Sequence, residues 1–379
     1  YEESGWDEQE YSGIGDVSYF DPSDFQVRIT APANYKVVTT GSIVKRIPSK
    51  QGKIVLYSQS KMTRDFEVEL SARFEELTRI QNRVIVRSFF LPEHAESGKR
   101  VLDSAVQALE YYEKNFGPYP YTELDVVEAP LYGGAGGVEF PGIVTISSML
   151  YRDVTPDAQD DLLKKLIADN PTFDQLIEFV VAHEVAHQWW NAVVGSNSKQ
   201  FPFIDEAMAN FSAILYFEHY YGRQAAENQM ALQMKVNYQL HRLLGGSDQP
   251  VQQPASSFKG ALEYSAIVYG KGALYFDHLR SLIGDAAFFA VMRKYYDSYW
   301  FRIAGPDDFR IIAQKQAPPK RRQIEQLHQR WLKERHGDED IGPGTLDAVF
   351  RTVLGAQSQV PPPDLDKLLK GLDDLLKQQ

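Results

Sequence analysis

Two histidines and a glutamate stand in a pattern that can bind a metal ion. His183 and His187 are four positions apart, and Glu184 follows the first of them directly. Residues four apart lie on one face of a helix, so both imidazole rings can reach the same ion. His-Glu-x-x-His on a helix is a zinc-binding pattern in which the glutamate is a general base. Two core histidines on one helix are the competing interpretation, which three fixed positions do not exclude.

A second carboxylate favours the metal interpretation. Glu206 opens a predicted second helix, and the 18 residues between His187 and Glu206 allow a turn and an antiparallel return. The apolar face of that helix would contain Phe211, Ile214, Leu215 and Phe217. Two histidines and one glutamate leave the fourth position of a tetrahedral zinc open, as catalytic sites do. We therefore predict one Zn²⁺ bound by His183, His187 and Glu206. Glu184 would act as the general base on a water in the open position.

The same stretch resembles the aminopeptidase N-type (gluzincin) metallopeptidases, whose mark is His-Glu-x-x-His, 18 residues and then Glu. Four further segments resemble motifs of that family: FGPYPY at 116–121, GGVEF at 136–140, HQWW at 187–190 and YGKG at 269–272. The segments occur in the order of the family. The resemblance covers about residues 1–335 and is strongest from 116 to 285.

The resemblance implies roles for side chains outside the metal motif. Tyr269 would stabilise the oxyanion that forms during attack on a peptide carbonyl, with Tyr264 as a supporting candidate. Glu139 would bind the free α-ammonium group of a substrate, which is the mark of an aminopeptidase. The glycine-rich stretch containing Gly136 and Gly137 would let a substrate backbone approach and pair as an added strand.

Some positions depart from the family or have two interpretations. Val138 keeps the apolar role of the family's Met, whereas Phe140 lacks the amide of its Asn, so a hydrogen bond from that amide is in doubt. Asn210 lies one turn after Glu206 and either holds a metal ligand or is helix surface. The HQWW segment would continue the zinc helix, with its two tryptophans packed against neighbouring elements.

The hydrophobic pattern of the segments that must position these residues changes along the chain. Up to about residue 95, polar residues alternate with β-branched or aromatic ones, as at 25–30, 36–40 and 66–70. This alternation predicts antiparallel strands. From about residue 96 the spacing becomes helical. One face of the first predicted helix carries Val101, Ala105, Leu109 and Tyr112.

These patterns and the resemblance predict an α+β protein. We expect a partial N-terminal antiparallel β domain at 1–95, a thermolysin-like, mostly helical metallopeptidase domain at 96–340 and a C-terminal helical tail at 341–379. Relatives carry more sheet before their Gly-Pro-Tyr-Pro segment, so we expect an N-terminally truncated, bacterial-type member. In the tail, a leucine stripe at 365–376 predicts a helix that packs on the chain's own core or binds a partner.

Composition excludes several other classes. The chain has 379 residues, a net charge of −11 and no cysteine. An acidic chain without a long basic run is a poor candidate for binding nucleic acid. The lack of cysteine excludes a disulfide scaffold, a zinc-thiolate site and a thiol nucleophile. No apolar run approaches the length of about 18 residues that a membrane span needs. The location stays open, and one expectation is the extracytoplasmic part of a longer bacterial protein.

The sequence therefore predicts a zinc aminopeptidase whose partners are peptides with a free N-terminus. Two alternatives stay open at this point. The first is a zinc endopeptidase that uses the same chemistry, and the second is a binding or scaffold relative without activity. A non-peptidase branch of the leukotriene-hydrolase type shares the zinc motif, but nothing in the sequence marks a long lipid tunnel.

Overall fold

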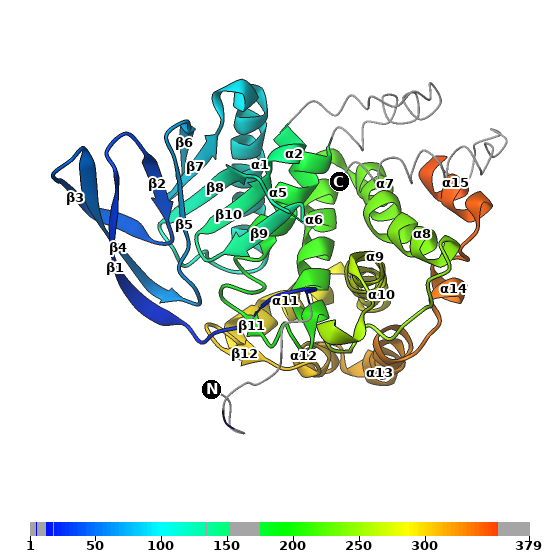
Figure 1. Cartoon of the computed structure of the whole chain (residues 1–379). Helices are drawn as coiled ribbons and strands as arrows, with labels where there is room; N and C mark the ends of the chain where they lie inside the picture. The colour runs from blue at the N-terminus through cyan, green and yellow to red at the C-terminus, as the bar shows by residue number, and fades with distance from the viewer. Residues whose placement is uncertain (1–4, 6–12, 18, 133–134, 152–174, 355–379) are drawn as a thin grey trace.

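Most strands lie on one side of the molecule and most helices on the other (Figure 1). The computed structural model describes residues 5, 13–17, 19–132, 135–151 and 175–354. The leucine stripe at 365–376 and residues 355–379 of the predicted tail lie outside this part of the chain. The strands are β1 (Ser23–Pro32), β2 (Lys36–Thr39), β3 (Ser42–Pro48), β4 (Lys53–Thr63), β5 (Val68–Ser71), β6 (Glu75–Gln81), β7 (Val84–Phe90), β8 (Glu123–Ala129), β9 (Gly137–Phe140), β10 (Ile143–Ser147), β11 (Gly195–Ser196) and β12 (Ile303–Ala304). The helices are α1 (Ala95–Asn115), α2 (Ser148–Tyr151), α5 (Leu176–Ala186), α6 (Glu206–Tyr221), α7 (Arg223–Met230), α8 (Asn237–Leu243), α9 (Ala261–Tyr264), α10 (Ala273–Ile283), α11 (Asp285–Ser298), α12 (Asp308–Gln316), α13 (Arg321–His328), α14 (Gly337–Asp340) and α15 (Leu346–Leu354).

The N-terminal region forms antiparallel sheets, as its alternating pattern predicts. β4 lies between β1 and β3 in a three-stranded sheet, and β2 pairs with β5. In β1, Phe25, Val27 and Ile29 are more buried than the residues between them, because alternate side chains point to the same face. The three predicted strands at 25–30, 36–40 and 66–70 correspond to β1, β2 and β5.

A second, five-stranded sheet adjoins the helices. Its order is β6-β7-β8-β10-β9, with parallel pairing of β7, β8 and β10 and antiparallel pairing of the outer strands. β8 and β10 are almost wholly buried, as is typical of parallel strands covered on both faces. The parallel pairing of β7 with β8 differs from the antiparallel arrangement expected before residue 95. This sheet joins strands from both sides of residue 95, the predicted boundary of the first domain. The division into domains at 1–95, 96–340 and 341–379 stays a prediction.

α1 packs on this sheet and on α5. All four residues of its predicted apolar face are buried: Val101, Ala105, Leu109 and Tyr112. The turn after α1 requires a glycine, because Gly117 has a φ of +147° and a Cβ there would lie 2.4 Å from the ring of Tyr296. Trp189 Nε1 donates a hydrogen bond to the carbonyl of Gly117 at 2.9 Å. The FGPYPY segment thus connects α1 to the core beside the zinc motif.

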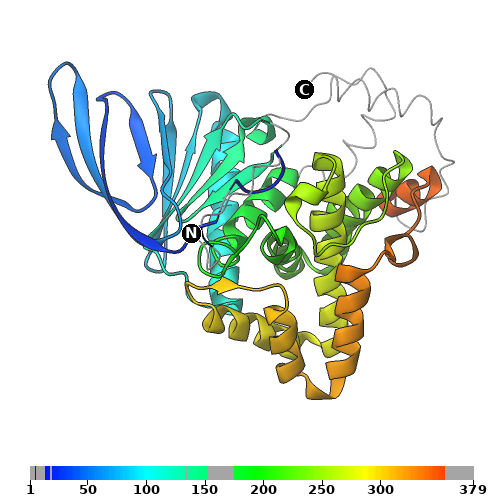
Figure 2. The same cartoon turned by 60° about the horizontal axis from the view of Figure 1, so that its bottom comes forward.

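α5 and α6 are neighbours between the five-stranded sheet and the outer helices (Figures 1 and 2). The residues from Glu206 to Phe217 in α6 are all buried, so the prediction of a single apolar face was too narrow. The expectation that the zinc helix continues through 187–190 was wrong. α5 ends at Ala186, and the backbone bonds after it become mixed in spacing. Trp189 N–H bonds the carbonyl of Ala186, three residues back, at 2.9 Å, and Trp190 N–H bonds the same carbonyl, four residues back, at 3.0 Å.

The remaining helices form the half of the molecule opposite the sheets (Figure 2). Three segments in it have the wider π-helical turn: Ala231–Val236, Ser265–Gly272 and Gln329–Lys333. A π-helical turn inside helical structure is frequent at functional sites. None of the described helices combines the length and the apolar character needed to cross a lipid bilayer.

Candidate metal centre and substrate cleft

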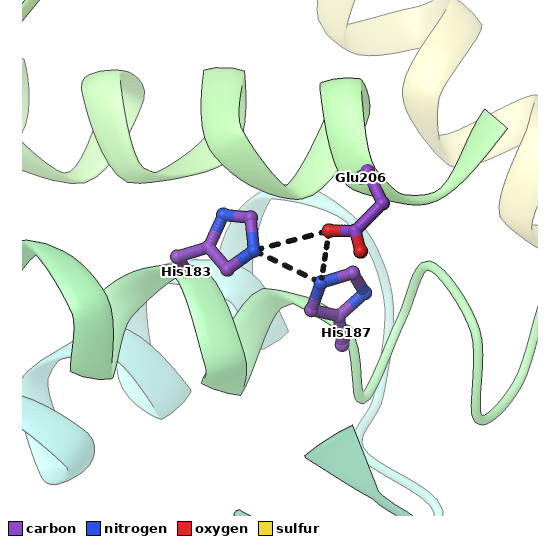
Figure 3. A group of neighbouring side chains, drawn as sticks. All are labelled: His183, His187 and Glu206. Carbon is purple, nitrogen blue, oxygen red and sulfur yellow. Dashed lines mark hydrogen bonds and ion pairs between the residues drawn. The ribbon is translucent and has the colours of Figure 1, made fainter. Parts of the chain in front are cut away.

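The two histidines and the glutamate point toward one another between α5 and α6 (Figure 3). His183 Nε2 lies 3.1 Å from His187 Nε2. Glu206 Oε2 lies 3.4 Å from His183 Nε2 and 3.2 Å from His187 Nε2. All three side chains are buried or nearly so. The two predicted helices therefore bring these three atoms together within the core.

The geometry of the three atoms fits a tetrahedral zinc. Ligand atoms about 2.0–2.1 Å from such an ion stand about 3.3 Å from each other, close to the separations found here. His187 Nδ1 donates to the carbonyl of Trp190 at 3.0 Å, which leaves the lone pair of Nε2 facing the centre. Without a cation, two imidazole nitrogens and a carboxylate would face one another in a buried site. The residues present thus fit a divalent metal.

Buried negative charge surrounds this group. Burial raises the pKa of Glu139 to about 7. Burial, with repulsion from Glu139, raises the pKa of Glu184 well above its usual value. Burial by itself lowers the pKa of His187, yet the carboxylates of Glu139 and Glu206 raise it well above the ordinary range. A divalent cation would balance this excess of buried carboxylate, because a bound ion is the largest local charge in such a site.

Glu184 lies outside the group of three metal-ligand atoms but close to it. Its side chain is 4% exposed, and Oε2 has no hydrogen-bond partner among the described residues. A Cβ at position 137 would lie 2.4 Å from Glu184 Oε1, so only glycine lets β9 lie this close to the carboxylate. An unbonded carboxylate oxygen beside a metal centre can accept a proton from a water.

Tyr269 reaches the same centre from the π-helical segment Ser265–Gly272. Its hydroxyl donates a hydrogen bond to Glu206 Oε1, and its ring lies 5.7 Å from that of His183. Asn210 Nδ2 donates to the carbonyl of Tyr269 at 2.8 Å, so this amide holds the segment that carries the tyrosine. Tyr264 packs edge-on against Tyr269, with ring centroids 5.7 Å apart.

Lys271 fixes the other side of this segment. Its side chain is 1% exposed and contacts Asp248 at 2.9 Å. Its ammonium also donates to the carbonyls of Gln249 and Glu334, each at 2.9 Å. A buried charge needs such a full set of partners. Tyr269 therefore lies in a segment that is bonded to α6 on one side and to the loop residues Asp248, Gln249 and Glu334 on the other.

β9 carries Glu139 into the cleft. Among the described strands this one is the last of the five-stranded sheet, so one of its edges has no neighbour among them. Gly137 opens the strand, and the carbonyl of the preceding Gly136 accepts a hydrogen bond from Ser147 N–H at 2.9 Å. An open strand edge with little side-chain bulk is a surface on which an extended peptide can pair.

One cavity of about 750 Å³ joins these features. All nine predicted site residues line it: Gly136, Gly137, Glu139, His183, Glu184, His187, Glu206, Tyr264 and Tyr269. A pocket of this volume is large enough for a small peptide. The structure thus brings all nine residues to one cavity. Their individual roles stay predictions.

A second group of neighbouring ligand atoms, from Glu139, Glu184 and His187, lies within 4.8 Å of one another. It cannot hold a second ion through His187, because one ring nitrogen is bonded to Trp190 and the other faces Glu206. Within the described ranges, no other histidine of the chain belongs to a group with metal-ligand spacing.

Several residues of the cleft were not predicted from the sequence. The N-terminal residues 13–17 and 19–20 line the cavity, and burial together with repulsion from Glu139 raises the pKa of Asp16 to about 7. Asn191 donates to Glu139 Oε1 at 2.8 Å. Gln188, next to a metal-ligand candidate, bonds the turn between β9 and β10. No spacing rule links these positions, so only the folded chain reveals them.

Known proteins resemble this chain in sequence and in fold. Residues 100–331 match the peptidase family M1 domain. Over 240 residues the chain is 29% identical to aminopeptidase N of Lactobacillus delbrueckii subsp. lactis, which covers 61% of this chain and 26% of that protein. Over 315 residues it is 24% identical to aminopeptidase M1-B of Oryza sativa subsp. japonica, covering 82% of this chain and 34% of that protein. The chain thus spans between a quarter and a third of the length of these relatives.

A solved structure shares the fold. An M1 zinc metallopeptidase from Deinococcus radiodurans superposes with a TM-score of 0.62 at 18% identity, covering 84% of this chain and 66% of that one. The α+β architecture of a β-rich N-terminal part and a mostly helical part is therefore confirmed. The family match includes α5, α6 and the segment of Tyr269. This chain belongs to peptidase family M1.

Proposed function

We propose that this chain is part of a zinc aminopeptidase that hydrolyses the N-terminal peptide bond of peptides with a free amine. One observation carries the proposal: the candidate metal ligands His183, His187 and Glu206 share a cavity with the buried carboxylate of Glu139. Family membership and the aminopeptidase names of the relatives support the same activity. When bound, zinc supplies an acidified water and polarises the substrate carbonyl.

Glu184 is proposed as the general base. Its free oxygen can accept the proton of the attacking water and can then deliver that proton to the leaving nitrogen. Tyr269 is proposed to stabilise the developing oxyanion. Its phenol stays protonated, because burial raises its pKa well above the usual value, so it remains a hydrogen-bond donor at neutral pH.

Glu139 is proposed as the anchor for the substrate's α-ammonium group. The ammonium would sit near the carboxylates of Glu139 and Glu184, which lie close together beside His187. The substrate backbone would pair with the open edge of β9 next to Gly136 and Gly137, with Tyr264 on the facing wall. Because the anchor and the metal centre lie in one cavity, the first peptide bond is the one that reaches the nucleophile.

The alternatives make different use of the same cavity. An endopeptidase would need an open path past Glu139, whose buried charge disfavours an uncharged peptide segment at that position. A scaffold relative without activity would not need a complete set of metal ligands, a base and a phenol. We therefore favour the aminopeptidase over both.

Zinc content, measured together with a panel of aminoacyl substrates, tests the proposal. The purified protein should contain about one zinc per chain and should release the reporter group from at least one free aminoacyl derivative. Dialysis against a chelator should abolish the release, and added zinc should restore it. A protein that retains zinc but cleaves none of the panel would contradict the proposed activity and would favour a scaffold role.

A further inference from the structure

The turn that follows the zinc helix connects the metal centre to the proposed amine anchor. We call residues 187–193 the clamp turn. Its first residue is the metal-ligand candidate His187. Two residues of the turn contact β9 and the turn after it, namely Gln188 and Asn191. These two side chains join the loop after α5 to the strand that carries Glu139.

The contacts of Gln188 fix the position of β9. Its side-chain amide donates to the carbonyl of Phe140 at 2.9 Å and its amide oxygen accepts from Gly142 N–H at 2.8 Å. Both partners lie at the turn between β9 and β10. The side chain is 1% exposed, so water does not compete for these bonds. The end of the strand that carries Glu139 is thereby tied to the residue next to His187.

Asn191 completes the link at the carboxylate itself. Its Nδ2 donates a hydrogen bond to Glu139 Oε1 at 2.8 Å, which restricts the orientation of the carboxylate. Because the acceptor can be ionised, this hydrogen bond is of the stronger, charge-assisted kind. Asn191 also lines the cavity, whereas the side chain of Phe140 offers no amide at this strand. The family motif has an Asn at the position of Phe140, so this chain lacks a side-chain amide there. The amide of Asn191, from the clamp turn, lies beside Glu139 instead.

The clamp turn is itself held from several sides, so Asn191 is not a mobile side chain. The guanidinium of Arg64 donates to the carbonyls of Ala192 and Val193 at 3.2 and 3.1 Å. Trp190 Nε1 donates to Ser212 Oγ at 2.9 Å. A hydrogen bond from a fixed donor orients its acceptor at little entropic cost, which is how supporting residues hold a binding group in its working geometry.

We propose that Asn191 is a positioning residue for amine recognition: its amide orients Glu139 at a fixed place relative to His187, so that the ammonium of the substrate and the scissile bond are in register. This inference rests on the proposed function, since it concerns the same cleft. Asn191 would contact the anchor and not the reacting atoms. Its removal should therefore weaken the recognition of a free amine and leave the metal centre intact.

A pair of ligands that differ only in the amine provides the test. Leucine hydroxamate carries the α-amine, and 4-methylpentanohydroxamic acid is the same molecule without it. Calorimetry on the zinc-loaded protein should show that Asn191→Ala weakens binding of the first about 10- to 100-fold, the range expected for a lost charged hydrogen bond, with little change for the second. Asn191→Leu, which keeps volume at this position but has no donor, should give the same selective loss. Asn115→Ala, whose amide bonds the carbonyl of Tyr111 at 2.8 Å, is the matched control and should change neither affinity.

A double-mutant cycle with Glu139→Ala separates positioning from general stabilisation. If Asn191 acts through Glu139, adding Asn191→Ala to Glu139→Ala should cost no further affinity for leucine hydroxamate. Equal weakening of both ligands in both Asn191 variants, or fully additive losses in the cycle, would overturn the inference. A wild-type protein that binds the two hydroxamates equally well would instead overturn the amine anchor of the proposed function. If the wild type prefers leucine hydroxamate and the Asn191 variants prefer it to the same degree, only the role of Asn191 is overturned.

Discussion

Glu184→Gln is expected to lower kcat by about 10²- to 10⁴-fold, the usual contribution of a general base. Glutamine has the shape of glutamate and still forms hydrogen bonds, but it cannot take a proton from the attacking water. The change should spare the metal, because Glu184 lies outside the His183, His187 and Glu206 group. Metal content and kcat, measured on the same preparation, should therefore separate: zinc near one equivalent, turnover nearly lost.

A second glutamate on the same helix provides the control for that variant. Glu178 accepts hydrogen bonds from the hydroxyls of Tyr216 and Tyr221, away from the cleft. Glu178→Gln should keep kcat near the wild-type value. If Glu184→Gln retains wild-type turnover, Glu184 is not the base. If it loses zinc along with activity, its carboxylate supports the metal and the assignment of roles has to be revised.

His183→Ala is expected to remove both the metal and the activity. The variant leaves two ligands where catalytic zinc sites use three. Loss of a residue that only supports a ligand typically costs about 10- to 100-fold in metal affinity, so loss of a ligand should cost more. The purified variant should contain little zinc, and its aminoacyl hydrolysis should stay at background even after zinc is added at the concentration that saturates the wild type.

His219→Ala is the matched control, because His219 stacks on Tyr111 with ring centroids 4.9 Å apart and lies outside both groups of ligand atoms. It should keep its zinc and its activity. A His183→Ala protein with a full equivalent of zinc at wild-type affinity would show that the ion binds elsewhere. That result would remove the structural basis of the proposed mechanism, whatever the activity of the protein.

The grouping of the candidate metal ligands could be predicted from the sequence, because helical spacing within a short segment determines it. Helical periodicity alone places His183 and His187 on one face, and Glu206 needs only a second helix that returns alongside the first. The same holds for the buried face of α1 and for the alternation in β1. In each case a short stretch of residues determines which side chains share a surface.

Features that depend on distant packing could not be predicted. Residues 187–190 contain no helix-breaking residue, yet α5 ends at Ala186, where Trp189 and Trp190 enter the core. Likewise, the alternating pattern of β7 does not distinguish antiparallel pairing with β6 from parallel pairing with β8. Asn191 and Glu139 are separated by 52 positions, so their contact depends on how the clamp turn sits against β9. Tertiary contacts of this kind override local propensity.

Roles of single residues lie between these two cases. Glu139, Tyr264 and Tyr269 were singled out by the family resemblance and not by their own spacing, and the structure brings all three to the cavity. All three side chains line the same cavity as the candidate metal ligands, so each position needs a residue that fits this cavity. The identity of a residue that supports them, such as Asn191, follows only from its hydrogen bonds.

The most direct test of the central claim compares one peptide in two forms, with a free N-terminus and with an acetylated N-terminus, on the zinc-loaded protein. Mass spectrometry identifies the products over time. The account predicts stepwise release of the N-terminal residue from the free peptide and an intact acetylated peptide, because acetylation removes the positive charge that Glu139 binds. Cleavage of both forms at equal rates, or at internal bonds, would contradict an aminopeptidase anchored at Glu139.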